Sequence, residues 1–228
     1  MPKRPSKLVH FECSDKFNHE SWDDKRALLN FPRPYRAILS GPPNVGKTSV
    51  IKTLLCTADP LFERGFVWHP DPDVVESGEY SDCGLEPIQR LPPTRYWYDE
   101  NPDKKHMVLV IDDIDLASLD KEQRHLLDRL VSNVSTHASL SIIMASQIFF
   151  NLPPFLRKTA NLFVLYRPVS EEQDNRAISK RVGLSPDTLA SLFRDHCATP
   201  HNSVWIDLSS SSPAKIRIDG TKVLKEKS

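Results

Sequence analysis

Short apolar runs, each closed by glycine, proline or charged residues, set the pattern of this 228-residue chain. The runs are rich in β-branched and other large apolar residues, which is typical of strands buried on both faces of a parallel sheet. They lie at Tyr35–Ser40, Gly65–Trp68, Met107–Ile111, Leu140–Ala145 and Asn161–Tyr166. The sequence therefore predicts a central, mostly parallel sheet.

Helical periodicity occupies the intervals between these strands. Asp120, with Gln123 three residues further on, forms a variant of the capping box and precedes a helix whose apolar residues share one face. Those residues are Leu126, Leu127, Leu130, Val131 and Val134. Further helices are expected at Thr48–Leu55 and in two stretches within Glu171–Phe193. Alternating strands and helices predict an α/β fold with helices flanking the sheet.

The remaining segments define the expected domain organisation. Residues 1–34 are expected to form an N-terminal adapter, with a strand near Leu8–Glu12, a helix at His19–Leu29 and the breaker FPRP. The main domain spans 35–219, within which 70–105 is expected to be a proline-rich surface insertion. Val204–Leu208 and Lys215–Ile218 flank SSSSP as a C-terminal β-hairpin, and residues 220–228 form a basic tail.

Two features of the insertion stand out. It carries six acidic residues and no lysine or arginine from Asp71 to Glu86. The cluster Tyr96, Trp97 and Tyr98 has the composition of a stacking platform for single-stranded nucleic acid, but an apolar anchor of the insertion onto the domain is the favoured interpretation.

Composition narrows the class of protein. Thirty basic residues balance thirty acidic ones, so net charge does not indicate a nucleic-acid partner. We expect a protein without a membrane-spanning segment, because no apolar run reaches the roughly eighteen residues that a spanning helix needs. The four cysteines are far apart and contain no CxxC pair, which favours reduced thiols in an intracellular compartment.

The segment GPPNVGKT at 41–48 matches the phosphate-binding pattern GxxxxGK[ST], between an expected strand and an expected helix. Glycines let such a loop curl so that backbone N–H groups and the helix N-terminus face the phosphates of ATP. Lys47 is expected to reach the β- and γ-phosphates, and Thr48 to ligate Mg²⁺. The predicted ATP-binding residues are Gly41, Pro42, Pro43, Asn44, Val45, Gly46, Lys47, Thr48 and Ser49.

Acids follow the apolar strand MVLVI. Asp112 is predicted to hold Mg²⁺ through its waters, from a strand expected to lie next to that of the phosphate loop; the alternative is a helix cap. Asp113 occupies the position where many ATPases have a glutamate that polarises the attacking water. Because aspartate is one methylene shorter, Asp115 stays an alternative base.

Two further residues are candidates for catalysis. Gln147 follows the strand LSIIMA, where its side chain is placed to sense the γ-phosphate or the attacking water, although a plain polar strand end is the alternative. Arg157 is expected in a loop behind Pro153 and Pro154, from which it would reach a neighbour's ATP as an arginine finger if subunits form a ring. Competitors for that role are Arg129, Arg167 and Arg181.

The order of these parts resembles the FtsK/HerA-type packaging ATPases of double-stranded DNA viruses and related virus-like elements. The motifs that carry the resemblance are GPPNVGKTSV, VLVIDDID, STHASLSIIMASQ, LRKTANLFVLYRPVSEEQ and HNSVWIDLSSSSPAKIRI, across residues 35–219. The resemblance implies a RecA-like (ASCE) P-loop NTPase. Lys47 and Thr48 would be its Walker A residues, Asp112 and Asp113 its Walker B pair, Gln147 its sensor and Arg157 its finger.

The resemblance also implies a biological role. Members of this group assemble as homo-oligomeric rings, here a pentamer or hexamer, that hydrolyse ATP to drive double-stranded DNA into a preformed capsid. The expected partners are therefore DNA and a viral capsid or portal vertex. The expected location is the cytoplasm or nucleus of the host cell, or the virion.

Other functions remain open. A superfamily 3 replicative helicase shares GPPNxGK. Such helicases resemble a different layout, with closer Walker motifs and an asparagine sensor where this chain has Gln147. A P-loop nucleotide kinase would have an arginine-rich lid, which this sequence lacks. An AAA+ remodeller would have a C-terminal helical lid, whereas this chain closes with the strand-like segments VWIDL and KIRID. A scaffold that binds ATP only as a structural ligand is disfavoured by the intact Asp112 and Asp113.

Overall fold

The computed structural model describes residues 29, 31, 33–71, 73–74, 78–80, 82–116, 118–168, 171–209 and 215–224. The expected strand at Leu8–Glu12, nearly all of the expected helix at His19–Leu29, most of the serine run and residues 225–228 lie outside this range. Within it, no helix has both the length and the apolar character needed to cross a bilayer.

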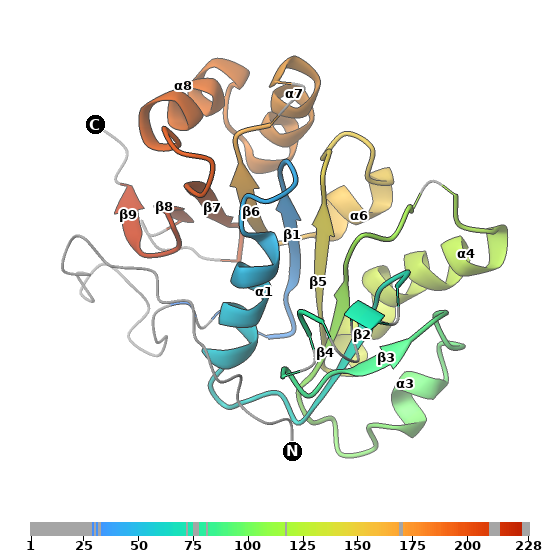
Figure 1. Ribbon diagram of the computed structural model, residues 1–228. Helices are drawn as coiled ribbons and strands as arrows, with labels where there is room; N and C mark the ends of the chain where they lie inside the picture. Colours follow the sequence, from blue (N-terminus) through green and yellow to red (C-terminus); the bar gives the residue numbers. More distant parts are fainter. Residues whose placement is uncertain are drawn as a thin grey trace.

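The described residues build one nine-stranded sheet in the order β3-β2-β4-β5-β1-β6-β7-β8-β9 (Figure 1). All pairs from β3 to β6 are parallel, and β7, β8 and β9 each run antiparallel to the strand before them. The strands are β1 (Arg36–Ser40), β2 (Arg64–Trp68), β3 (Glu86–Ile88), β4 (Met107–Ile111), β5 (Leu140–Ser146), β6 (Leu162–Tyr166), β7 (Ser203–Asp207), β8 (Ile216–Ile218) and β9 (Lys222–Leu224). The predicted α/β class and mostly parallel sheet are confirmed.

Helices lie on both faces of this sheet (Figure 1). They are α1 (Lys47–Cys56), α3 (Tyr96–Asp99), α4 (Lys121–Arg129), α5 (Ser135–His137), α6 (Pro154–Thr159), α7 (Glu171–Val182) and α8 (Pro186–His196). A π-helical turn at Leu130–Val134 joins α4 to α5. The helices expected within the described residues therefore exist, with ends that differ by one to three residues from the predicted ones.

The central strands are apolar throughout because both of their faces are covered. All five residues of β4 are buried, and successive side chains point to opposite faces. Leu109 and Ile111 pack in the same core cluster as residues of α4, α7 and α8. Val108 and Val110 pack in the other cluster, which includes the apolar face of α1. Full burial of such side chains contributes about 1.5–3 kcal/mol each, so the two-layer covering fixes the sheet.

The strand order corrects one expectation. The strand that ends at Asp112 does not lie next to β1, because β5 is inserted between β4 and β1. A run that is apolar on both faces identifies a central strand, but it carries no information about which strands are its neighbours. Both strands nevertheless end at the same edge of the sheet, which is the property that the predicted site needs.

The expected loop around Arg157 is wrong as well. Residues Pro154–Thr159 form helix α6, with Pro154 in the first turn. Proline is tolerated at the start of a helix because the N–H that it lacks would have no helical partner there. The second of the two prolines therefore starts the helix rather than preventing it.

Part of the segment 70–105 belongs to the sheet and is not only a surface insertion. Glu86–Ile88 forms β3, which pairs in parallel with β2 at the edge of the sheet. An edge strand tolerates Pro87, because such a strand has a neighbour on one side only and its other side needs no hydrogen-bond donors. Trp97 on α3 is only 1% exposed and meets Phe66 edge to face at 5.2 Å, as an apolar anchor should.

The chain ends in antiparallel strands. Val204–Ile206 of β7 pair with Ile216–Ile218 of β8, which confirms the predicted C-terminal hairpin. β9 then pairs with β8, so three residues of the segment expected to be a basic tail belong to the sheet.

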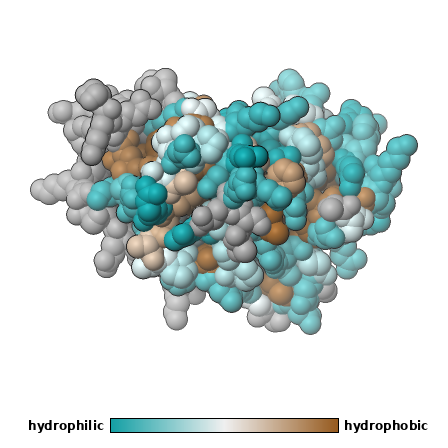
Figure 2. All heavy atoms as spheres, turned by 90° about the horizontal axis from the view of Figure 1, so that it is seen from above, coloured by the Kyte–Doolittle hydropathy of each residue, from teal (hydrophilic) through white to brown (hydrophobic). Residues whose placement is uncertain are grey.

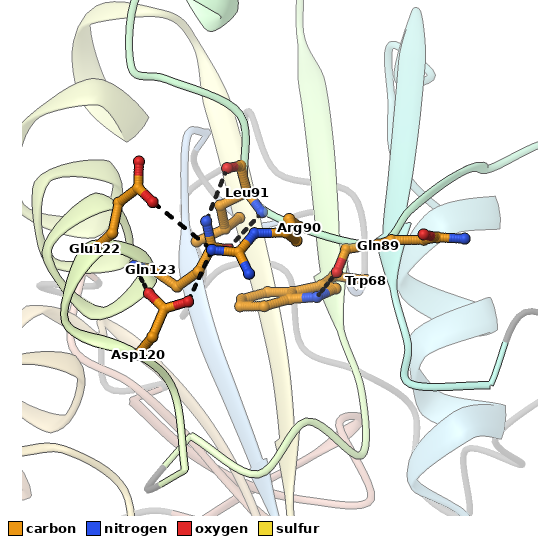
Figure 3. Close-up of polar contacts among 7 residues, drawn as sticks. All are labelled: Trp68, Gln89, Arg90, Leu91, Asp120, Glu122 and Gln123. Atoms are coloured by element: carbon orange, nitrogen blue, oxygen red, sulfur yellow. Dashed lines mark hydrogen bonds and ion pairs between the residues drawn. The ribbon is translucent and has the colours of Figure 1, made fainter.

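Polar contacts fix the segment after β3 to the start of α4 (Figure 3). Asp120 caps α4 by accepting a hydrogen bond from the backbone N–H of Gln123 at 2.8 Å. The Gln123 side chain does not bond the backbone N–H of Asp120, as the corresponding residue of a capping box does. It accepts from the backbone N–H of Leu91 at 2.7 Å and donates to the carbonyl oxygen of Leu91 at 3.2 Å. Arg90 adds an exposed ion pair with Asp120 at 2.7 Å.

We expect Gln123→Leu to destabilise the fold measurably. The substitution keeps the approximate volume but leaves the N–H and C=O of buried Leu91 without partners, at a cost of about 1–3 kcal/mol for each group. Denaturant unfolding of the variant measures the loss directly. Glu122→Gln is the matched control, because Glu122 is exposed and its ion pair with Arg90 is long, at 3.7 Å. Equal stability of the two variants would show that the Gln123 bonds do not hold the insertion.

Candidate functional site

The phosphate-binding loop joins β1 to α1 at the edge where the parallel strands end. A Cβ atom at Gly41 would lie 2.5 Å from the Cβ atom of Tyr166 on β6, so only glycine fits there. Gly46 has a φ of 99°, a conformation that residues with side chains rarely adopt. Gly41 is thus required by the close approach of Tyr166, and Gly46 by its own backbone conformation.

The start of α1 suits an anion. Gly46 cannot cap the helix with a side chain, and the first turn of α1 contains no acidic residue. The first backbone N–H groups of an α-helix have no partners within the helix, and the helix dipole makes this end positive. The described loop therefore fits the phosphate groups of a nucleotide.

Lys47 folds back over this loop. Its amine donates hydrogen bonds to the carbonyl oxygens of Gly41 at 2.8 Å and Pro42 at 2.7 Å. Burial lowers the pKa of Lys47, while the nearby carboxylates of Asp112 and Asp113 oppose that shift. The amine is therefore a partly desolvated donor directly above the loop, where a phosphate oxygen would replace the two carbonyls as its acceptor.

Asp112 follows β4 and is only 7% exposed. The hydroxyl group of Tyr80 donates a hydrogen bond to its Oδ2 atom at 2.6 Å. Burial raises the pKa of Asp112, the hydrogen bond from Tyr80 opposes this rise, and neighbouring Asp113 adds to it. A divalent cation would favour the ionised form, so a desolvated carboxylate next to Thr48 fits magnesium chemistry.

Tyr80 belongs to the same cluster. It is 1% exposed, and burial is the main cause of its raised pKa, followed by the charge of Asp112 and its hydrogen bond with that carboxylate. A hydrogen bond with the side chain of Thr48 acts in the opposite direction. One phenol thus contacts both side chains that were predicted to hold Mg²⁺.

A cavity of about 630 Å³ brings most of the predicted residues together. Its predicted members are Pro43, Asn44, Gly46, Lys47, Thr48, Ser49, Asp112, Asp113 and Gln147. The other predicted loop residues, Gly41, Pro42 and Val45, do not line the cavity, and Val45 is buried in the core. Gln147 reaches the cavity because β5 lies between β1 and β4. The separation of the two strands therefore places a third polar residue between the phosphate loop and Asp112.

The geometry distinguishes the two candidate bases. Asp113 lines both this cavity and an adjoining one of about 620 Å³, whereas Asp115 lines only the adjoining one. Asp113 has a φ of 51°, a left-handed conformation that aspartate tolerates better than most residues. This backbone turn places Asp113 at the junction of the two cavities, where Gln147 also lies.

Arg157 does not line the nucleotide cavity of its own chain. It lies on α6 beside a separate cleft, and its guanidinium group is 5.6 Å from the ring centre of Phe150. The same helix receives hydrogen bonds from Arg181, which donates to the carbonyl oxygens of Arg157 and Ala160. The structure therefore separates Arg157 from the other predicted site residues.

Sequence reasoning missed His69, Glu79 and His201, which line the cavity, and Tyr80, which lies behind Asp112. Glu79 and Tyr80 lie in the acidic, proline-rich segment that resembles a solvent-exposed insertion. His201 comes from the turn before β7, with its Nδ1 atom 3.3 Å from the carbonyl oxygen of Val45. The position of His69 directly after β2 is a usable signal, because it shares the strand-end edge with Asp112.

From above, the face at the carboxyl ends of the parallel strands shows hydrophilic residues around small hydrophobic patches (Figure 2).

No protein-family model matches the chain, and no curated protein matches it. Solved structures do. The genome-packaging NTPase B204 of Sulfolobus turreted icosahedral virus 2, in complex with sulfate, matches with a TM-score of 0.58 and 18% identity, over 84% of this chain and 98% of that one.

Two further matches agree. The DNA-packaging ATPase B204 of Sulfolobus turreted icosahedral virus has a TM-score of 0.57 and 14% identity, over 82% of this chain and 98% of that one. The cytoplasmic domain of the type VII secretion ATPase EccC from Thermomonospora curvata reaches 0.51 and 14%, over 78% of this chain and 24% of that one. This chain has a RecA-like P-loop NTPase fold.

The P-loop NTPase fold accounts for the position of the cavity. In open α/β sheets, ligands bind beyond the carboxyl ends of the strands, where the first glycine loop meets the neighbouring strand ends. The same B204 protein has also been solved with ATP-γ-S and with AMPPCP, at TM-scores of 0.56 and 0.55 to this chain. These matches show that the two proteins share a fold.

We expect Tyr80→Phe to raise the Mg²⁺ concentration that gives half-maximal binding of a fluorescent ATP analogue, on the order of tenfold. Outer-shell partners orient metal-ligating carboxylates, and their loss typically costs 10–100-fold in metal affinity. The measurement is a Mg²⁺ titration at fixed analogue concentration.

Tyr98→Phe is the matched control, because this tyrosine is 40% exposed and lies outside the cavity. An unchanged Mg²⁺ midpoint in Tyr80→Phe would show that the hydroxyl group does not orient Asp112. A lower midpoint would show that the hydroxyl competes with the ion.

Proposed function

We propose that this chain hydrolyses ATP with Mg²⁺ in the cavity between the phosphate loop and Asp112, and that a ring of such subunits uses the hydrolysis to drive double-stranded DNA into a preformed viral capsid. The observation that carries the proposal is the convergence of Lys47, Thr48 and Asp112 on one cavity. The similarity in fold to genome-packaging NTPases supports the choice of packaging over other uses of ATP.

Each residue has a defined role in this proposal. The amine of Lys47 holds the β- and γ-phosphate oxygens and offsets the negative charge that develops on them. The hydroxyl of Thr48 and the carboxylate of Asp112 hold the magnesium ion. When bound there, Mg²⁺ supplies positive charge to the phosphate oxygens.

Asp113 and Gln147 serve the attacking water. Asp113 accepts its proton, and the side-chain amide of Gln147 orients it, because both residues line the cavity on the side of Asp112. Although aspartate is shorter than glutamate, Asp113 does line the nucleotide cavity. Asp115 is the less favoured base because it does not line the nucleotide cavity.

Arg157 acts on the neighbouring subunit in this proposal. Its distance from the cavity of its own chain fits a finger that is supplied by the next subunit of a ring. The guanidinium Nε atom is buried without a hydrogen-bond partner among the described residues, so a finger would act through the terminal nitrogen atoms of Arg157. Pentameric and hexameric rings both satisfy this requirement.

Lys47→Ala is expected to lower ATP turnover by at least about a hundredfold, the usual cost of losing one preorganised charge-stabilising donor. The variant should unfold at nearly the wild-type temperature, because the amine bonds only the loop carbonyls. Steady-state phosphate release with and without double-stranded DNA tests the assignment. Wild-type kinetics in this variant would refute it.

The same assay separates the rival functions. Stimulation of the wild-type protein by double-stranded DNA supports a motor. Phosphoryl transfer to a small acceptor instead indicates a kinase, strand separation indicates a helicase, and absence of turnover indicates a scaffold.

Arg157→Ala is expected to bind nucleotide with near wild-type affinity but to lower turnover in the assembled ring by roughly a thousandfold, the lower end of the effect of an arginine finger. Mixing it with Lys47→Ala subunits should restore part of the turnover, because these subunits are inactive but retain Arg157. Unchanged turnover of the Arg157→Ala ring would assign the finger to another arginine.

A further inference from the structure

A second cleft, of about 520 Å³, lies between α6 and α7, away from the nucleotide cavity. Five of its lining residues are basic and none is acidic: Arg157, Lys158, Arg176, Lys180 and Arg181. This concentration of charge is not a consequence of composition, because the whole chain has as many acidic as basic residues. The cleft is therefore a locally positive surface on a neutral protein.

Two of the five cations have local roles. Arg181 is a structural residue, since it donates to the carbonyl oxygens of Arg157 at 3.0 Å and Ala160 at 2.6 Å and so joins α7 to the end of α6. Arg176 forms an exposed ion pair with Glu172 one turn earlier, at 2.8 Å. Exposed pairs of this kind contribute little energy and are easily exchanged for another anion.

The remaining charges are not neutralised within the described part of the chain. Lys158 and Lys180 are exposed, and neither has an ion pair with a described residue. Asp174 on α7 is buried, accepts a hydrogen bond from the backbone N–H of Phe150 at 2.7 Å and interacts electrostatically with Arg157 rather than with the two lysines. The cleft thus presents cations from two helices toward the same open space.

An exposed aromatic ring borders these cations. Phe150 is 48% exposed at the mouth of the cleft, the largest exposed fraction among the large hydrophobic residues of the described chain. Basic side chains beside an accessible aromatic ring suit a ligand that combines repeated negative charge with sugar or base surface. Its cations come from both helices, which suits a ligand that carries more than one phosphate group.

We propose that the α6–α7 cleft binds the sugar-phosphate backbone of DNA, with Lys158 and Lys180 contacting phosphates and Phe150 packing against the sugar. This inference rests on the proposed function, because it identifies the face through which the motor grips its DNA. Arg157, which lines the same cleft and is proposed as the finger, is not assigned to DNA. Contacts of this kind position a protein on DNA without reading its sequence.

The experiment compares the double variant Lys158→Gln, Lys180→Gln with the matched control Lys104→Gln, Lys121→Gln, which removes the same charge from exposed lysines outside the cleft. Binding of the full chain to a fluorescent DNA duplex is measured by anisotropy over a series of salt concentrations. Each lost phosphate contact lowers the slope of log Kd against log salt by about 0.9. The cleft variant should therefore lose about 1.8 of this slope and on the order of tenfold or more in affinity at moderate salt, whereas the control should match wild type. Thermal unfolding checks that both variants are folded.

Each alternative outcome has a separate meaning. If wild type binds DNA and the cleft variant binds with the same slope and affinity, the inference is wrong while the proposed function stands. If the cleft variant instead loses its oligomeric state, measured by light scattering, with no change in DNA binding, the cleft is an interface between copies and the inference is wrong. If wild type does not bind DNA at all, the proposed function fails and the inference fails with it.

Discussion

The register of three parallel strands is the constraint on which the rest of this structure depends. β1, β5 and β4 lie side by side, with Ser40 paired to Ser146 and Ile111 paired to Met144. Because the strands are aligned, the segments that follow them begin at one edge of the sheet. The phosphate loop, Gln147 and Asp112 meet there, although long stretches of chain separate them in sequence. A shift of one strand by one residue would turn its side chains to the opposite face and dismantle the cavity.

The cavity stores unfavourable electrostatics that a nucleotide would relieve. Asp112 and Lys47 are both buried, and burial disfavours the charged form of each, as the directions of their pKa shifts show. Local hydrogen bonds compensate in part: Tyr80 donates to Asp112, and Lys47 donates to two loop carbonyls. Lys47 and Asp112 also attract each other. In the proposed function, the polyphosphate would add a negative partner for the amine and the magnesium ion a positive partner for the carboxylate.

Much of the fold and of the core of the site could be predicted from the sequence. Continuous apolar runs identified the central strands, and the glycine pattern identified the loop, because both signals are local. The position of β5 between β1 and β4 is not local, so the pattern predicted Gln147 as a site residue but not its place between the loop and the acid. Tyr80 and Gln123 were missed or misread for the same reason. Each makes its decisive bonds to a residue 32 positions away, inside or beside a segment whose composition resembles a surface insertion. Arg157 was misplaced because proline stops a helix that precedes it but starts one that follows it.

The most direct test of the account is the structure of the protein bound to Mg²⁺ and a non-hydrolysable ATP analogue. We expect the Lys47 amine to leave the carbonyl oxygens of Gly41 and Pro42 for the β- and γ-phosphates, with the metal between Thr48 and Asp112. A structure in which the analogue binds elsewhere, while Lys47 keeps its two carbonyl partners, would contradict it.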